Sequence, residues 1–166
     1  LASTLSADGS TLACEAIMTT DTRKKELAVE FKIGDKLCHI GGISKGSGMI
    51  NPNMATMLAF ITTDVKIHYE LLKKALKRTT EITYNMVSVD GDTSTNDTVC
   101  IMASGLAGND EITAEDKNYE IFLNGLYAVM MNLARETARD GEGATKLMEC
   151  VVQNAPTEAI AKSVAL

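Results

Sequence analysis

The chain has 166 residues, of which 45% are hydrophobic and 4% aromatic, and its formal net charge is −6 at pH 7. This length fits one domain with a sizeable core. The negative charge disfavours broad binding to nucleic acid or to an anionic membrane, because both need basic patches. No apolar run approaches the roughly 18 residues of a membrane span. We therefore expect a single domain over 1–166 that binds neither nucleic acid nor a membrane.

The first half of the chain reads as strands. Apolar and polar residues alternate over 27–33, which predicts a half-buried strand. Gly34 and Asp35 then fit a two-residue hairpin turn with glycine at its first central position, and 36–40 returns as the partner strand. A continuous apolar run over 57–62 predicts a strand buried on both faces.

The middle of the chain mixes helical and extended patterns. Asp64 precedes apolar residues at helical spacing over 67–76, so we predict a helix with Asp64 as its N-cap. Residues 86–89 read as a short strand. Residues 97–106 read as a helix that Gly105 or Gly108 would end.

The last part predicts a long amphipathic helix. It begins at Thr113 and carries an apolar stripe that is typical of core packing. Residues 146–151 alternate like a strand, and Thr157 fits the N-cap of a final helix. The fold class expected from the whole pattern is α+β.

The segment from Lys45 to Phe60, KGSGMINPNMATMLAF, leads from glycines and turn residues through Ala55-Thr56 into a buried strand. A small residue before a threonine at such a place is where a chain could cut itself. The cut would free Thr56 with both a hydroxyl and an α-amine, and that amine, with an ordinary pKa of about 7.7–8.0, is a built-in base for the hydroxyl. Spacing alone also fits a glycine-rich turn that enters a core strand.

Four blocks carry a resemblance to a known family. They are AIMTTDT (16–22), the segment just described, SVDGDTSTND (88–97) and DGEGATK (140–146). Together they resemble the ornithine acetyltransferase family of arginine biosynthesis, also called the bifunctional glutamate N-acetyltransferases. The resemblance runs over nearly the whole chain.

The resemblance implies a layered α/β/β/α sandwich in a self-processing enzyme that resembles the N-terminal nucleophile hydrolases. Members of the family are much longer, so 1–166 is expected to be one central fragment of a catalytic domain. Cleavage between Ala55 and Thr56 would leave 1–55 as the end of an α chain and 56–166 as the start of a β chain. The family's oxyanion hole and its C-terminal substrate residues then lie outside this chain. The family also implies a heterotetramer of two α and two β chains.

The implied reaction moves acetyl from N-acetylornithine to glutamate through an acetyl group on Thr56, with ping-pong kinetics. Implied substrate ligands are Thr19, Lys45, Thr56 and Glu142. Each assignment has an alternative. Thr20 could take the role of Thr19, and Lys45 could be a solvated lysine of a loop without contact to substrate. The glycines beside Glu142 also fit a plain turn. No cofactor or metal is expected, and the sequence leaves open whether acetyl-CoA also serves as donor.

The run from Asp90 to Asp97 is acidic and hydroxyl-rich but lacks the spacing of an EF-hand calcium loop. Such runs more often tie turns and cap backbone amides, so we expect a structural role. Two other functions stay open: a self-processing aminopeptidase or amidohydrolase, and an inactive unprocessed chain whose glycine-rich loop only binds an anion. The family implies a cytoplasmic enzyme in bacteria and a mitochondrial one in fungi.

Overall fold

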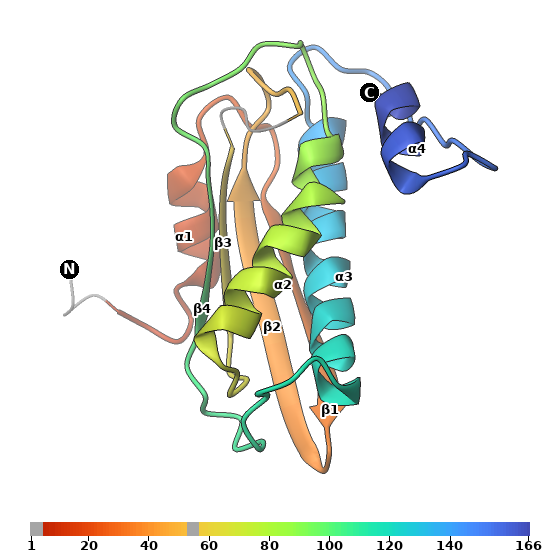
Figure 1. The fold of residues 1–166 in the computed structure, drawn as a ribbon. Helices are drawn as coiled ribbons and strands as arrows, with labels where there is room; N and C mark the ends of the chain where they lie inside the picture. The colour runs from red at the N-terminus through yellow and green to blue at the C-terminus, as the bar shows by residue number, and fades with distance from the viewer. Residues whose placement is uncertain (1–4, 53–56) are drawn as a thin grey trace.

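The computed structural model describes residues 5–52 and 57–166. Its centre is one four-stranded mixed sheet in the order β1-β2-β3-β4 (Figure 1). The α+β class predicted from the sequence is confirmed. In chain order the elements are α1 (Ser10–Ile17), β1 (Lys25–Ile33), β2 (Lys36–Lys45), β3 (Leu58–Thr63), α2 (Tyr69–Glu81), the 3₁₀ helix η2 (Tyr84–Met86), β4 (Thr98–Ala103), α3 (Lys117–Arg139) and α4 (Glu158–Ala165).

The predicted hairpin is confirmed, and so is a strand in the apolar run, β3. The prediction that this strand is buried on both faces is wrong, because Phe60 is only partly buried and Thr62 is exposed on the sheet face that carries no core. β1 pairs antiparallel with β2, and Ile33 faces Lys36 at the closed end, where Gly34 has a φ of 62°. Glycine adopts this left-handed conformation without steric penalty. β2 pairs antiparallel with β3, and the last pair of their ladder joins Lys45 to Leu58.

The prediction of a helix over 97–106 is wrong, because Thr98–Ala103 is strand β4, parallel to β3. Helix α2 lies in the connection between these two strands. The returning chain satisfies the free edge of β3, and a run that contains Val99 and Ile101 suits a strand well. Both residues pack against the core.

Three smaller predictions are also wrong. Residues 84–86 form η2 where a strand was expected over 86–89, and 146–151 form neither helix nor strand. The N-cap of α2 is His68, not Asp64. The Asp64 carboxylate instead accepts the backbone amide of His39 at 2.7 Å and contacts His39 Nδ1 at 2.7 Å. A tertiary partner has therefore replaced the local capping role.

Two helix ends follow ordinary capping. The side chain of Asp116 accepts the amides of Asn118 and Tyr119 at the start of α3, a few residues after the predicted start at Thr113. Thr157 caps α4 as predicted, since its hydroxyl accepts the amide of Ile160 at 3.2 Å. None of the helices among the described residues has the length and apolar character that crossing a membrane requires.

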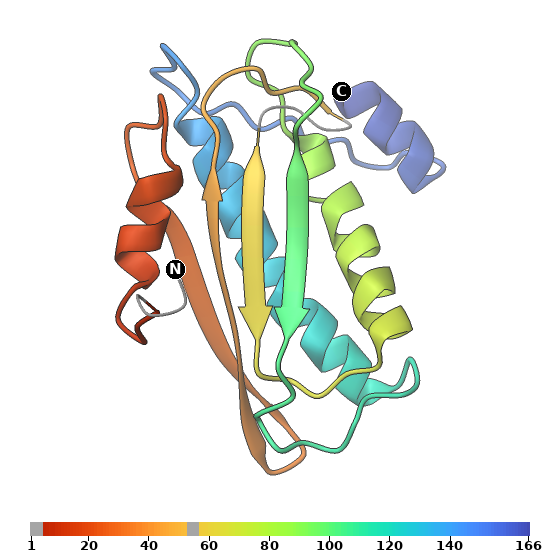
Figure 2. The ribbon, with the colours of Figure 1, turned by 90° about the vertical axis from the view of Figure 1, so that its left-hand side faces the viewer.

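The core lies between one face of the sheet and helices α2 and α3 (Figure 2). The stripe predicted for α3 is buried there: Tyr119, Phe122, Leu123, Leu126, Met130, Leu133 and Ala134. On the other face α1 covers only the side of β1 and β2 (Figure 2). Shallow hollows on that face are lined by Ala28, Gly41 and Phe60 among others, so this sheet face is largely open.

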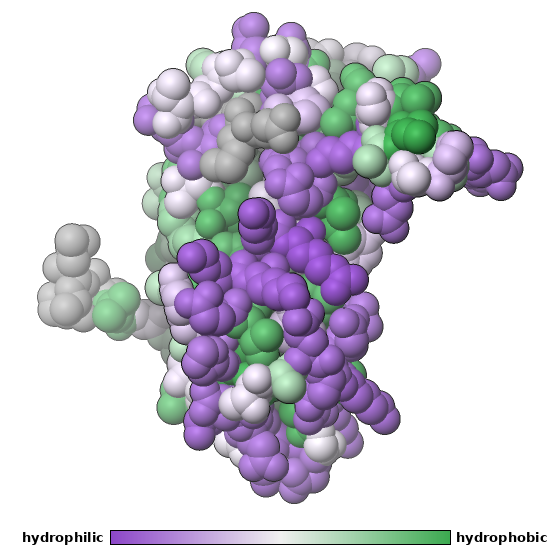
Figure 3. Space-filling view, viewed as in Figure 1, coloured by the Kyte–Doolittle hydropathy of each residue, from purple (hydrophilic) through white to green (hydrophobic). Residues whose placement is uncertain are grey.

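The outer surface is polar over α2 and apolar on α4 (Figure 3). None of the residues of α4 is buried, and Ile160 and Val164 are exposed. A lysine of α4, Lys162, reaches the carbonyl and the carboxylate of Glu81 at the end of α2, each at 3.1 Å. The helix is thus held by polar contacts rather than by burial.

Candidate functional site

Three connecting segments meet at the end of the sheet where β2 finishes; we call this the site end. They are the segment after α1, the glycine-rich segment after β2 and the turn after α3. Lys45 Nζ donates to Thr19 Oγ1 at 2.9 Å, and the hydroxyls of Thr20 and Ser47 lie 2.6 Å apart. The amide of Glu142 donates to the carbonyl of Ser47 at 2.7 Å. Three residues predicted from the sequence, Thr19, Lys45 and Glu142, are therefore carried to one place.

The two charged members of this group differ in burial. Lys45 is only 7% exposed, which does not fit a solvated loop lysine. Glu142 is exposed, and its carboxylate lies against Gly48. A Cβ added to Gly48 would come within 2.9–3.1 Å of the carboxyl atoms of Glu142. The glycine thus leaves the space that the carboxylate occupies.

A buried ion-pair network, which sequence reasoning missed, lies beneath these segments. Lys25 Nζ donates to Asp21 Oδ1 at 2.7 Å and to Asp140 Oδ2 at 2.6 Å, and the three side chains are at most 1% exposed. One signal was present in the sequence, because Lys25 is in phase with the inward positions Leu27 and Val29 of its strand. A lysine at a buried position needs a partner.

Both carboxylates of this network are stabilised in the charged form. Burial alone would raise the pKa of Asp21, but the Gly46 amide, the Lys25 ammonium and the Thr19 amide outweigh it and bring the pKa below its usual value. Burial also opposes ionisation of Asp140. The Lys25 ammonium, with the hydroxyl and amide of Thr22, lowers its pKa below the usual value.

Asp90 holds the glycine-rich segment from the other side. Its carboxylate accepts the amides of Met49 at 2.6 Å and Ile50 at 3.0 Å, and Met49 has a positive φ of 58°. The expected structural role of the run that begins at Asp90 is seen in these bonds. Among residues 5–52 and 57–166 no group of three His, Cys, Asp or Glu side chains is arranged to hold a metal ion.

Asp97, at the end of the same run, fixes the entry to β3. Its Oδ1 accepts the amide of Met57 at 2.7 Å, and the carbonyl of Met57 accepts the amide of Thr98 at 3.0 Å. Its Oδ2 is buried and has no hydrogen-bond partner among residues 5–52 and 57–166, and burial raises the pKa of this carboxyl against the effect of the Met57 amide. The predicted cleavage site, Ala55 and Thr56, lies outside the described residues.

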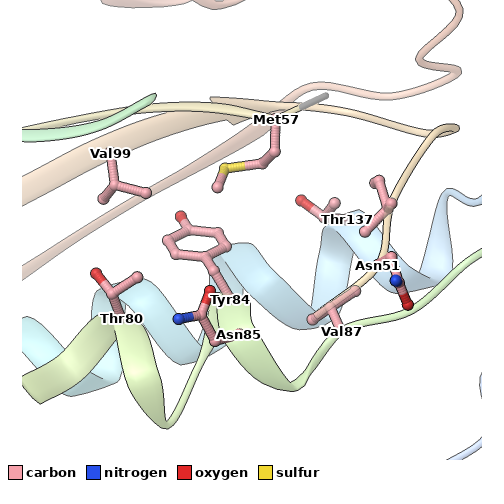
Figure 4. Close-up of a pocket in the computed structure, with 9 residues that line it drawn as sticks. Asn51, Met57, Thr80, Tyr84, Asn85, Val87, Val99 and Thr137 are labelled. Atoms are coloured by element: carbon pink, nitrogen blue, oxygen red, sulfur yellow. The ribbon is translucent and has the colours of Figure 1, made fainter. Parts of the chain in front are cut away.

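The side chain of Met57 lines a small cavity (Figure 4). It points toward the ring of Tyr84, which comes from η2, and Val99 and Thr137 line the same space (Figure 4). The cavity measures about 10 Å³, room for about one water molecule. It is therefore a packing gap beside the start of β3 and not a substrate pocket.

Comparison with known proteins assigns the family. The family model described as "ArgJ family" matches residues 1–166. The arginine biosynthesis bifunctional protein ArgJ of Symbiobacterium thermophilum is 51% identical over 164 residues, which are 99% of this chain and 41% of that protein. The protein of the same name from Lactococcus lactis is 52% identical over 151 residues, 91% of this chain and 38% of that protein.

A solved structure agrees. The crystal structure of ArgJ from Bacillus halodurans matches with a TM-score of 0.62 and 47% sequence identity, over 64% of this chain and 50% of that one. The chain thus spans about two fifths of the length of the curated relatives it matches. On this evidence the chain belongs to the ArgJ family.

Proposed function

We propose that this chain is the central part of a glutamate N-acetyltransferase that moves acetyl from N-acetylornithine to glutamate in arginine biosynthesis. Family membership supports this activity, because the relatives are named as arginine biosynthesis bifunctional proteins. The observation that carries the proposal is the meeting of Thr19, Lys45 and Glu142 at the site end. These residues lie far apart in the sequence, and the fold brings their segments together.

Strand register supports Thr56 as the nucleophile of the same site. Lys45 and Leu58 are Cα partners at the last position of the β2–β3 ladder. Two residues of chain reach at most about 7 Å. Thr56 precedes Leu58 by two residues in the sequence, so a nucleophile at this position would act at the end of the sheet that carries Lys45.

The proposed chemistry proceeds in two stages. In the precursor, the Thr56 hydroxyl attacks the Ala55 carbonyl carbon, and the bond from that carbon to the Thr56 nitrogen breaks, which forms an ester and frees the Thr56 amine. Water then hydrolyses the ester, which releases the Ala55 carboxylate and restores the Thr56 hydroxyl. In the mature enzyme that amine takes the proton as the hydroxyl attacks the acetyl group of N-acetylornithine, and ornithine leaves with its amine protonated. The amine of glutamate then attacks the acetyl group on Thr56. N-acetylglutamate leaves, and the Thr56 hydroxyl is restored.

The charges at the site end suit amino-acid substrates. The ammonium of Lys45 is held out of bulk water and can pair with a substrate carboxylate, while the hydroxyl of Thr19 beside it offers a second polar contact. The Glu142 carboxylate can pair with the side-chain ammonium of ornithine. One site would then serve donor and acceptor in turn, as ping-pong kinetics requires.

The rest of the enzyme is expected to complete both the fold and the site. The open sheet face offers Ala28, Gly41 and Phe60 for a second sheet to cover, in keeping with an α/β/β/α sandwich. The oxyanion hole would come from outside this chain. Removal of one such donor typically lowers kcat by about 10²–10³. We expect the full enzyme to be a heterotetramer of two α and two β chains, free of metal and cofactor, and cytoplasmic in bacteria.

The test uses the full-length protein. Denaturing mass spectrometry should show two chains, one that ends at Ala55 and one that begins at Thr56. Acetyl transfer from acetylornithine should require glutamate. Thr56→Ala should abolish both, whereas Thr113→Ala, which removes an exposed threonine hydroxyl, should change neither. Turnover that does not depend on glutamate would favour the hydrolase, and a Thr56→Ala protein that still divides and transfers acetyl would refute the proposal. Replacing acetylornithine by acetyl-CoA decides whether the latter is a donor.

A further inference from the structure

We propose that Lys25 is a positioning residue that holds Thr19, Lys45 and Glu142 in one constellation without touching substrate. This inference deepens the proposed function and rests on it. Within the described part of the chain, the Lys25 ammonium donates to Asp21 and Asp140 and to none of the three ligands. Its influence on the site must therefore pass through these two carboxylates.

Asp21 connects Lys25 to two of the three segments. Its Oδ1 accepts both Lys25 Nζ and the amide of Gly46, each at 2.7 Å. Its Oδ2 accepts the amide of Thr19 at 3.2 Å. One carboxylate thus fixes the backbone of Thr19 and the peptide that follows Lys45. The contact between the Lys45 ammonium and the Thr19 hydroxyl depends on this shared anchor.

Asp140 connects Lys25 to the third segment. Its Oδ2 accepts Lys25 Nζ at 2.6 Å and the amide of Thr22 at 3.0 Å, and its Oδ1 accepts the Thr22 hydroxyl. Asp140 caps the end of α3 and stands two residues before Glu142. The turn that carries Glu142 is therefore tied to the segment that carries Thr19.

Burial makes this junction stiff. The side chain of Lys25 is fully buried, and each carboxylate is only 1% exposed, so any movement that separates them leaves a charge without a partner. Such separation is strongly unfavourable, whereas a whole buried ion pair adds little net stability over apolar residues of similar size. The geometric effect of the network thus outweighs its contribution to folding.

The expected signature is kinetic. Because both substrates use one site, a loosened junction should impair both half-reactions. Lys25→Met in the full-length enzyme should lower kcat/KM for acetylornithine and for glutamate by roughly 10- to 100-fold, since small misplacements cause losses of this order. The dissociation constant of ornithine, measured by titration calorimetry, should rise as well. Lys25→Arg, which keeps the charge, should restore part of the loss.

A milder variant protects the test against misfolding. Thr22→Val removes only the hydroxyl that donates to Asp140, and should lower both kcat/KM values by roughly 2- to 10-fold. The matched control is Lys74→Met, because Lys74 is an exposed lysine that pairs with Glu115 at 2.6 Å on the surface. It should leave kcat/KM and ornithine affinity at wild-type values. Folding of every variant is checked by circular dichroism and thermal melting.

The outcomes separate this inference from the proposed function. If the wild-type enzyme transfers no acetyl, the proposed function fails and the inference fails with it. If the wild type transfers acetyl, and Thr22→Val and every folded Lys25 variant keep wild-type kcat/KM and ornithine affinity, only the role of Lys25 is refuted. Losses that are matched by an equal loss of folded protein would likewise reduce Lys25 to a structural residue.

Discussion

The Lys45 ammonium donates a hydrogen bond to the Thr19 hydroxyl at 2.9 Å, although the two residues stand 26 positions apart. The neighbouring hydroxyl of Thr20 pairs with Ser47 instead. Sequence alone could not choose between the two threonines. The structure places Thr19 beside the buried cation, so we expect Thr19 to contact substrate and Thr20 to support the loop.

Thr19→Val and Thr20→Val in the full-length enzyme test this choice. Thr19→Val should raise KM for acetylornithine and glutamate by roughly 10-fold, because a lost hydrogen bond to a charged group is worth about 1.5–3 kcal/mol and part of it is regained from water. Thr20→Val should change KM by no more than about 2-fold, within the range of a weakened neutral bond. Steady-state kinetics with each substrate varied gives the comparison. The reverse order of effects would assign the contact to Thr20.

A second prediction concerns the space that Gly48 leaves for Glu142. Gly48→Ala should displace the carboxylate, because the added Cβ would come within 2.9–3.1 Å of its atoms. The exposed Glu142 side chain can move, so the fold should persist. We expect KM for acetylornithine to rise by about 5- to 10-fold, or on the order of 1 kcal/mol of binding.

A double-mutant cycle provides the control for Gly48. In the Glu142→Ala background the carboxylate is absent, so Gly48→Ala should then change KM little. If Gly48→Ala has the same effect in both backgrounds, the methyl group acts on the glycine-rich segment itself and not on Glu142.

The parts of the fold that could be predicted have local causes. The alternation over Lys25–Ile33 and the glycine turn specify β1 and β2, and the apolar period of α3 specifies its buried face. β4 could not be recognised from such local patterns. Residues Thr98–Ala103 form a strand because they pair with the edge of β3, which lies far away in the sequence. The local sequence favours Asp64 as a helix N-cap, but in the structure its carboxylate accepts the backbone amide of His39 instead.

The candidate site shows the same division. The family resemblance makes Thr19, Lys45 and Glu142 candidate substrate ligands, but the pairing of Thr19 with Lys45 depends on how distant segments pack. The buried network of Asp21, Lys25 and Asp140 could not be predicted because Asp140 lies 115 residues after Lys25 in the sequence, and only the fold brings the two together. The one sequence signal for it is that Lys25 lies on the same, inward face of its strand as Leu27 and Val29.

A third prediction concerns Asp97 and the rate of self-cleavage. Asp97→Ala removes the acceptor that holds the Met57 amide at 2.7 Å, one residue after the proposed nucleophile. The entry to β3 should loosen, and cleavage of the full-length precursor should slow by roughly 10-fold, the equivalent of about 1.4 kcal/mol. Asp97→Asn retains an accepting oxygen and should slow cleavage less.

The control for Asp97 is Asp92→Ala, which removes an exposed carboxylate from the same run. The time course of precursor division, followed by denaturing mass spectrometry, should match the wild type for this control. Equal cleavage rates for Asp97→Ala and the wild type would show that Thr98 and the packing of Met57 suffice to fix the strand entry.

The last prediction follows from the lowered pKa values of Asp21 and Asp140. An aspartate has an unfolded pKa of about 3.9, and both carboxyls lie below their usual value in the folded protein. The unfolded state therefore binds more protons, so stability rises with pH through this window. The contribution of the pair is fully present above about pH 4–5 and is lost as pH falls through the folded pKa values.

Asp140→Asn should remove part of this dependence. At pH 7 it breaks a buried ion pair, so the free energy of unfolding should fall by about 3 kcal/mol, and the gap to the wild type should close as pH drops below about 4. Urea midpoints measured from pH 7 to pH 3 give the two curves. Asp35→Asn, at an exposed carboxylate whose pKa is also lowered, through its hydrogen bond to Lys36, should follow the wild type closely. Parallel curves for Asp140→Asn and the wild type would mean that Asp140 titrates alike in the folded and unfolded states, and that its bonds to Lys25 and Thr22 do not favour the charged form.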